Sequence, residues 1–89
     1  MADVHLPSVL RPLFTDLPRH VDVDASTVGD AIARLDEQWP GIRDRLCEAG
    51  RPELRRHIHV YVDGERGDLD TAVEPRSRLD VIAAISGGA

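Results

Sequence analysis

The stretch that decides the fold is Thr27-Val-Gly-Asp-Ala-Ile-Ala-Arg-Leu-Asp-Glu-Gln-Trp39. Its apolar side chains recur at the spacing of one helix face, which predicts an amphipathic helix with a single buried stripe. This stripe consists of Val28, Ala31, Ile32, Leu35 and Trp39. Thr27 is placed to cap the first turn, and Asp30 follows three residues later, as in a capping box with Asp in place of Glu. Pro40 and Gly41 end the helix, so the stripe needs a separate surface to pack against.

Short strands flank this helix on both sides. Residues 3–6 and 19–24 alternate polar and apolar side chains before it, and residues 57–62 do so after it. Asp63-Gly64 follows the third strand at once and predicts a hairpin turn. Residues 65–67 are short and charged, as expected of an edge strand protected against further pairing.

Residues 79–85 are almost continuously apolar, which predicts a central strand buried on both faces. A second, shorter helix is predicted at 42–48 and one helical turn at 69–73. One main helix packed across a mixed sheet of four to five strands accounts for the buried stripes. The predicted fold is therefore α+β, a ubiquitin-like β-grasp, with a domain at 1–85 and a flexible tail at 86–89.

Length and charge exclude several classes of function. A chain of 89 residues forms one domain and has little room for a deep catalytic pocket, and it carries no catalytic triad spacing or phosphate loop, so we expect no enzyme. The net charge of −5 repels nucleic acid, and no apolar run reaches the roughly 20 residues of a membrane span. The lack of signal-peptide features and the single cysteine, Cys47, favour a cytoplasmic location.

All eleven basic residues are arginine. Without a lysine ε-amine the chain cannot accept an isopeptide bond on a side chain. A ubiquitin-like protein of this composition does not form chains of itself.

Four histidines are candidate metal ligands. His57 and His59 share one strand face, and His5 and His20 lie on strands expected to be neighbours. No cysteine or carboxylate pattern accompanies them, so the sequence predicts a partly solvated sheet face and no metal site. The carboxylates around the hairpin turn are interpreted as a solvated acidic patch; they are Asp63, Glu65 and Asp68.

Four segments in a fixed order carry a resemblance to a known family. They are Thr27–Ile32, Trp39–Ile42, Ile58–Gly64 and the strand Leu79–Ile82 that leads to Gly87-Gly88. Together they resemble the ubiquitin-fold sulfur carriers, which include the small subunit of molybdopterin synthase and the thiamine-biosynthesis sulfur carrier. The resemblance covers nearly the whole chain. Leu6–Pro12, and Trp39–Ile42 followed by Arg45-Leu46, are most similar to the actinobacterial carriers for cysteine biosynthesis.

The resemblance implies that Gly88 ends in a thiocarboxylate that donates sulfur. An ATP-dependent adenylyltransferase, similar to ubiquitin-activating enzymes, would join the terminal carboxylate to AMP, and sulfur would then displace the AMP. The carrier itself would bind no cofactor, and a synthase such as cysteine synthase would accept the sulfur. Gly87 and Gly88 suit the narrow channel of such an enzyme because they have no Cβ to clash there.

Carriers of this family dock through the sheet, which makes Arg56, His59 and Tyr61 candidate contacts, together with Ile85 and Ser86 at the start of the tail.

Ala89 departs from the family pattern, because it follows the second glycine. We expect a peptidase, for instance a metallopeptidase, to remove Ala89 before activation. Three alternatives stay open: a small subunit of molybdopterin synthase, another interaction module, and a protein modifier that joins its tail to target lysines.

Overall fold

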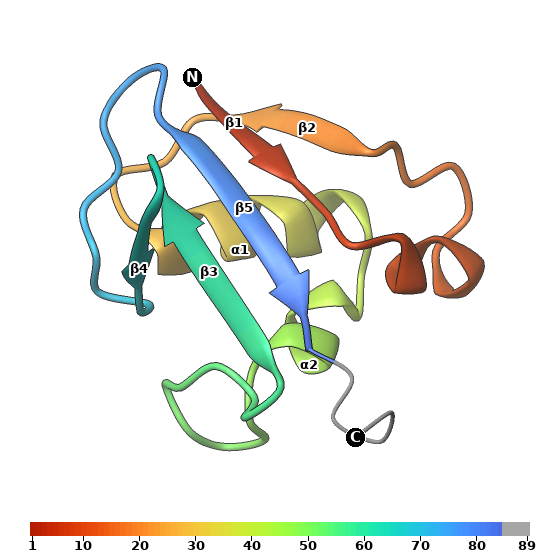
Figure 1. The fold of residues 1–89 in the computed structure, drawn as a ribbon. Helices are drawn as coiled ribbons and strands as arrows, with labels where there is room; N and C mark the ends of the chain where they lie inside the picture. The colour runs from red at the N-terminus through yellow and green to blue at the C-terminus, as the bar shows by residue number, and fades with distance from the viewer. Residues whose placement is uncertain (85–89) are drawn as a thin grey trace.

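Helix α1 crosses one face of a five-stranded sheet in the computed structural model, which describes residues 1–84 (Figure 1). The elements in chain order are β1 (Ala2–His5), the 3-10 helix η1 (Ser8–Leu13), β2 (His20–Val23), α1 (Val28–Gln38), α2 (Ile42–Leu46), β3 (Ile58–Val62), β4 (Glu65–Gly67) and β5 (Arg78–Ala83). The predicted β-grasp fold, with its mixed sheet and one main helix, is confirmed.

The strand order is β2-β1-β5-β3-β4. Strand β5 lies at the centre, parallel to β1 and antiparallel to β3, and the two outer pairs are antiparallel hairpin-like neighbours. The first and last strands of the chain are therefore hydrogen-bonded side by side. The last strand joins the two halves of the sheet and carries the chain toward the residues beyond 84.

The start of α1 is capped as the sequence predicts, with one difference. The hydroxyl of Thr27 accepts a hydrogen bond from the Asp30 N–H at 3.1 Å, while the Asp30 carboxylate accepts one from the Ser26 N–H at 3.3 Å. In a standard capping box the return bond goes to the cap residue itself. Here it ties down the residue before the cap, which also fixes the entry of the chain into the helix.

The core lies between α1 and the inner face of the sheet. Its fully buried members include Val28 and Leu35 from α1 and Val4, Val60 and Leu79 from three strands. Burying each such side chain contributes about 1.5–3 kcal/mol, so this layer supplies most of the favourable free energy of folding. Cys47 is also buried, as expected of a small core residue, and burial raises the pKa of its thiol.

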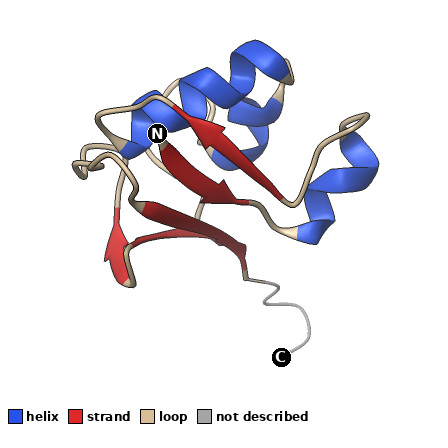
Figure 2. Ribbon diagram, turned by 90° about the horizontal axis from the view of Figure 1, so that it is seen from above, coloured by secondary structure: helices blue, strands red, loops and turns tan. Residues whose placement is uncertain are grey.

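The prediction that the last strand is buried on both faces is wrong. Leu79 and Val81 are buried against the helix side, but Ile82 is 44% exposed. The cause is visible in Figure 2, where α1 and α2 lie on one side of the sheet and leave its other face open. The strand also ends at Ala83, two residues before its predicted end.

Two further predictions need correction. Residues 69–73 form no helical turn; instead the Thr71 N–H donates to the Asp68 carbonyl at 3.2 Å, and Ala72 forms an isolated bridge with Thr27. The second helix stops at Leu46, before its predicted end at 48. No helix among residues 1–84 combines the length and apolar character that crossing a membrane requires.

Candidate functional site: the open sheet face and the end of strand β5

The open face of the sheet, on the side away from α1, carries the predicted docking residues His59 and Tyr61. Strand register places His59 opposite Ile82 and Tyr61 opposite Asp80. His59 and Tyr61 are half-buried, and Nδ1 of His59 is buried without a hydrogen-bond partner in the described part of the chain. A buried polar atom without a hydrogen-bond partner lowers the stability of the folded chain.

Arg56, the third predicted docking residue, is exposed but lies outside the sheet, in the turn that enters β3. It precedes His57, whose carbonyl accepts a hydrogen bond from the Ala84 N–H at 2.7 Å. The structure therefore places Arg56 near the end of β5, apart from the middle of the open face where Tyr61 lies.

A shallow groove crosses the open face between β1, β5 and β3. It is lined by His5, Leu6, Tyr61, Gly64, Asp80 and Ile82. Ile82 is the exposed apolar side chain in this groove, and the sequence analysis missed it because it treated the last strand as buried on both faces. The predicted fold already indicated that one side of the last strand would be exposed, since a single main helix covers only one face of a sheet.

A second apolar surface lies at the end of β5. Val9 and Leu13 of η1 are half-exposed there and share a groove with Ala83. Arg45 and Arg55 line the same groove. The chain thus leaves the sheet beside an apolar surface bordered by cationic side chains, in contrast to its net negative charge.

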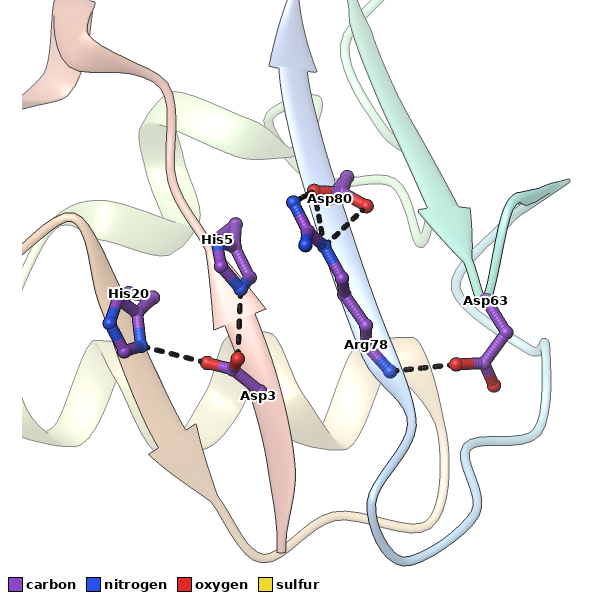
Figure 3. A network of polar contacts seen from close by, with 6 residues as sticks. All are labelled: Asp3, His5, His20, Asp63, Arg78 and Asp80. Carbon is purple, nitrogen blue, oxygen red and sulfur yellow. Dashed lines mark hydrogen bonds and ion pairs between the residues drawn. The ribbon is translucent and has the colours of Figure 1, made fainter.

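The turn between β3 and β4 is held by side chains as well as by backbone. Asp63 and Gly64 both have positive φ, 51° and 89°, as a tight hairpin turn requires. The Asp63 carboxylate accepts a hydrogen bond from the Arg78 N–H at 2.8 Å (Figure 3) and another from the Ser77 hydroxyl at 2.8 Å. These bonds hold the pKa of Asp63 below its ordinary value. Asp63 is therefore a structural link between the turn and β5 rather than part of a purely solvated acidic patch.

Three potential metal ligands meet on the open face at the β1–β2 side (Figure 3). Nε2 of His5 donates to the Asp3 carboxylate at 2.8 Å, and Nδ1 of His20 donates to its other oxygen at 2.9 Å. Burial alone would raise the pKa of the Asp3 carboxyl, but the bonds from both histidines outweigh it and hold this pKa below its ordinary value. The predicted placement of His5 and His20 on neighbouring strands is confirmed, whereas Asp3 was overlooked as their partner.

The predicted tail residues Ile85, Ser86, Gly87, Gly88 and Ala89 lie outside the described residues. What the structure describes is their point of attachment. Ala84 follows a central strand that is paired on both sides, by β1 and β3. This pairing fixes the position from which the tail begins.

Comparison with known proteins places this architecture in a family. The model of the ThiS family matches residues 4–88. The sulfur carrier protein CysO of Mycobacterium tuberculosis is 31% identical over 90 residues, covering 96% of each chain. The small archaeal modifier protein 3 of Haloferax volcanii is 32% identical over 72 residues, covering 76% of this chain and 75% of that protein.

Among solved structures, the Amycolatopsis orientalis BexX/CysO complex contains a chain that superposes with a TM-score of 0.87. That chain is 29% identical, and the match covers 99% of this chain and all of the other. The family consists of carrier proteins, which confirms the expectation that this chain is not an enzyme. The fold, the family match over residues 4–88 and the similarity to CysO together show that the chain belongs to the ThiS family of sulfur carriers.

Proposed function

We propose that this protein carries sulfur as a thiocarboxylate on Gly88, formed after Ala89 has been removed. The observation that carries the proposal is the family match, which runs from residue 4 to residue 88 and so ends on the second glycine of the pair. Cysteine biosynthesis is the favoured destination of the sulfur, because of the similarity to CysO proteins.

The chemistry needs a partner because a carboxylate is a poor electrophile. The C-terminal carboxylate of Gly88 attacks the α-phosphate of ATP in an adenylyltransferase, which forms an acyl adenylate and releases pyrophosphate. A sulfide equivalent then attacks the acyl carbon, the C–O bond to AMP breaks, and a thiocarboxylate remains. ATP is thus a substrate of the activating enzyme, and this chain holds no cofactor of its own.

The open face and the end of β5 are proposed as the docking surface for these partners. Ile82 offers an exposed apolar centre, and the half-buried rings of His59 and Tyr61 lie beside it on β3. The arginines near the end of β5, including Arg56, suit an acidic surface around the partner's channel. The relative from Amycolatopsis orientalis was solved in complex with a protein called BexX, and this supports the proposal that the present chain also binds a protein partner.

A direct test compares two forms of the full chain, one ending at Gly88 and one at Ala89. Each is incubated with ATP, sulfide and an adenylyltransferase from the same organism, and its intact mass is measured. We expect the mass gain of one oxygen-to-sulfur exchange on the Gly88 form alone. A gain on the Ala89 form would contradict the need for trimming, and no gain on either form would favour a role as an interaction module, such as a synthase subunit.

Protein modification is a second candidate, supported by the similarity to a Haloferax volcanii protein named as a modifier. In that role the activated Gly88 would be transferred to a lysine of another protein. The chain has no lysine of its own, so conjugates would contain one copy per acceptor lysine and no chains. Epitope-tagged protein, expressed in its own cells and analysed under denaturing conditions, would show discrete heavier conjugates in this case and none if the tail only donates sulfur.

A further inference from the structure

We infer that Asp3, His5 and His20 form a binding site for a first-row divalent cation, with Zn²⁺ as the best-matched ion. This site lies on the open face of the sheet, away from α1, and the carrier chemistry of the tail does not use it. Figure 3 shows the three side chains gathered between β1 and β2.

Strand register explains why these three residues meet. Asp3 and His5 are two residues apart on β1 and so point to the same face. His20 on β2 lies directly opposite His5, and Asp22 lies directly opposite Asp3. Four residues of metal-ligating type therefore occupy adjacent positions of one antiparallel pair, where opposite Cβ atoms are about 4.5–5.5 Å apart.

The potential ligand atoms already converge. One nitrogen from each histidine and one carboxylate oxygen all lie within 4.8 Å of one another. The two imidazole rings are stacked with centroids 5.0 Å apart and planes at 15°, so they reach the carboxylate from the same side of the sheet.

Ligands bound to Zn²⁺ at about 2.0–2.2 Å in tetrahedral geometry are roughly 3.3–3.5 Å apart. The two present nitrogen–oxygen distances of 2.8 and 2.9 Å would lengthen by about half an ångström, a change within reach of side chains that all lie at least partly at the surface.

The local charge distribution favours a cation. The Asp3 carboxylate is shared by two imidazoles, and Asp22 adds a second negative charge on the facing strand. Arg78 lies opposite Asp3 on β5 and would oppose a cation, but its guanidinium is paired with Asp80 at 3.0 Å (Figure 3). The guanidinium of Arg78 is thus directed to another carboxylate.

The donor set determines which ions fit. Two imidazoles and one carboxylate suit zinc and other first-row transition metals, whereas Mg²⁺ and Ca²⁺ prefer oxygen ligands alone. Three protein ligands leave one tetrahedral position open, and His20 is 59% exposed at the surface. Water or a side chain of a bound partner can occupy that position.

Calorimetric titration of the chelator-treated full chain with ZnCl₂ tests this inference, with MgCl₂ as the control ion. We expect one Zn²⁺ per chain and no Mg²⁺ binding. His20→Ala and Asp3→Asn should each weaken Zn²⁺ binding about tenfold or more. His57→Ala, which removes an exposed histidine outside the cluster, is the matched control and should bind as the unsubstituted chain does.

Ring-nitrogen NMR of ¹⁵N-labelled histidine provides the structural readout. Zn²⁺ should shift Nε2 of His5 and Nδ1 of His20 and leave both rings of His57 and His59 unchanged. Thermal unfolding of each variant without metal confirms that the fold is intact. Equal Zn²⁺ affinity in the His20→Ala chain, or the absence of Zn²⁺ binding below millimolar concentration, would overturn the site. These results do not depend on thiocarboxylate formation, so the two proposals can fail separately.

Discussion

The two faces of the sheet differ in what they contact: one packs against the helices and the other is uncovered. The inner face packs Val4, Val60 and Leu79 against α1, and these side chains are no more than 1% exposed. The open face presents Asp3 and His59, each one residue before Val4 and Val60, and Ile82, three residues after Leu79. This contrast teaches that helices on one side stabilise one face of the sheet and leave the other uncovered. The side chains that stabilise the fold and those proposed to contact partners therefore alternate along the same strands.

The largest effect expected from this contrast concerns stability. Leu79→Ala removes a fully buried side chain from the central strand and should lower the free energy of unfolding by about 2–5 kcal/mol. Ile82→Ala, three residues along the same strand on the open face, should cost less than about 1 kcal/mol. Urea unfolding of both variants measures the difference. Similar losses in the free energy of unfolding would show that side chains on the open face stabilise the fold as much as the buried ones do.

The reverse ranking is expected for activation of the tail. Ile82→Arg places a charge at the apolar centre of the proposed docking surface and should lower kcat/KM for thiocarboxylate formation about tenfold, which corresponds to about 1.4 kcal/mol. Val21→Ala, a half-buried position on the edge strand β2, serves as the control. An unchanged rate in the Ile82→Arg chain would remove Ile82 from the docking surface.

A smaller effect is expected at the helix cap. Thr27→Ala removes the acceptor of the Asp30 N–H and should lower the free energy of unfolding by about 1 kcal/mol. Because α1 packs on the inner face and the proposed docking surface lies on the open face, this loss should leave the rate of tail activation unchanged. A slower activation step would mean that the helix position also matters to the partner.

The smallest effect concerns acid stability through Asp63. Its pKa in the folded chain lies below the ordinary value of 3.8, because the Arg78 N–H and the Ser77 hydroxyl bond to the ionised form. The stabilisation is therefore fully present above the unfolded pKa and is lost as the pH falls through the folded pKa. Asp63→Asn should destabilise the chain at neutral pH, and the difference should shrink as the pH falls below 3.8. A difference that stays constant with pH would contradict this origin.

Local pattern was sufficient to predict much of this fold. Helix α1 and strand β3 follow from apolar spacing within one segment, and the turn at Asp63-Gly64 follows from residue types that tolerate positive φ. The burial of β5 was misjudged because an apolar run does not reveal how many faces are covered. That depends on where α1 and α2 pack, which is a long-range property.

In the candidate sites, too, local pattern predicted some features and long-range packing decided the others. His59 and Tyr61 could be assigned to one face by alternation alone. That Ile82 lies beside them could be known only from the strand order. The pairing of β1 with β2 was expected, but the register that brings Asp3 to His20 across 17 positions is encoded by no local pattern. The roles of Gly87, Gly88 and Ala89 stay predictions from chemistry and family resemblance.

The most direct test of the proposed function is the intact mass of this protein isolated from its own cells. Sulfur carriage on Gly88 predicts a chain that ends at Gly88, with a fraction that carries the mass of one oxygen-to-sulfur exchange. Alkylation of the thiocarboxylate before isolation preserves that fraction and marks it. A population that always ends at Ala89 with an ordinary carboxylate would contradict the account.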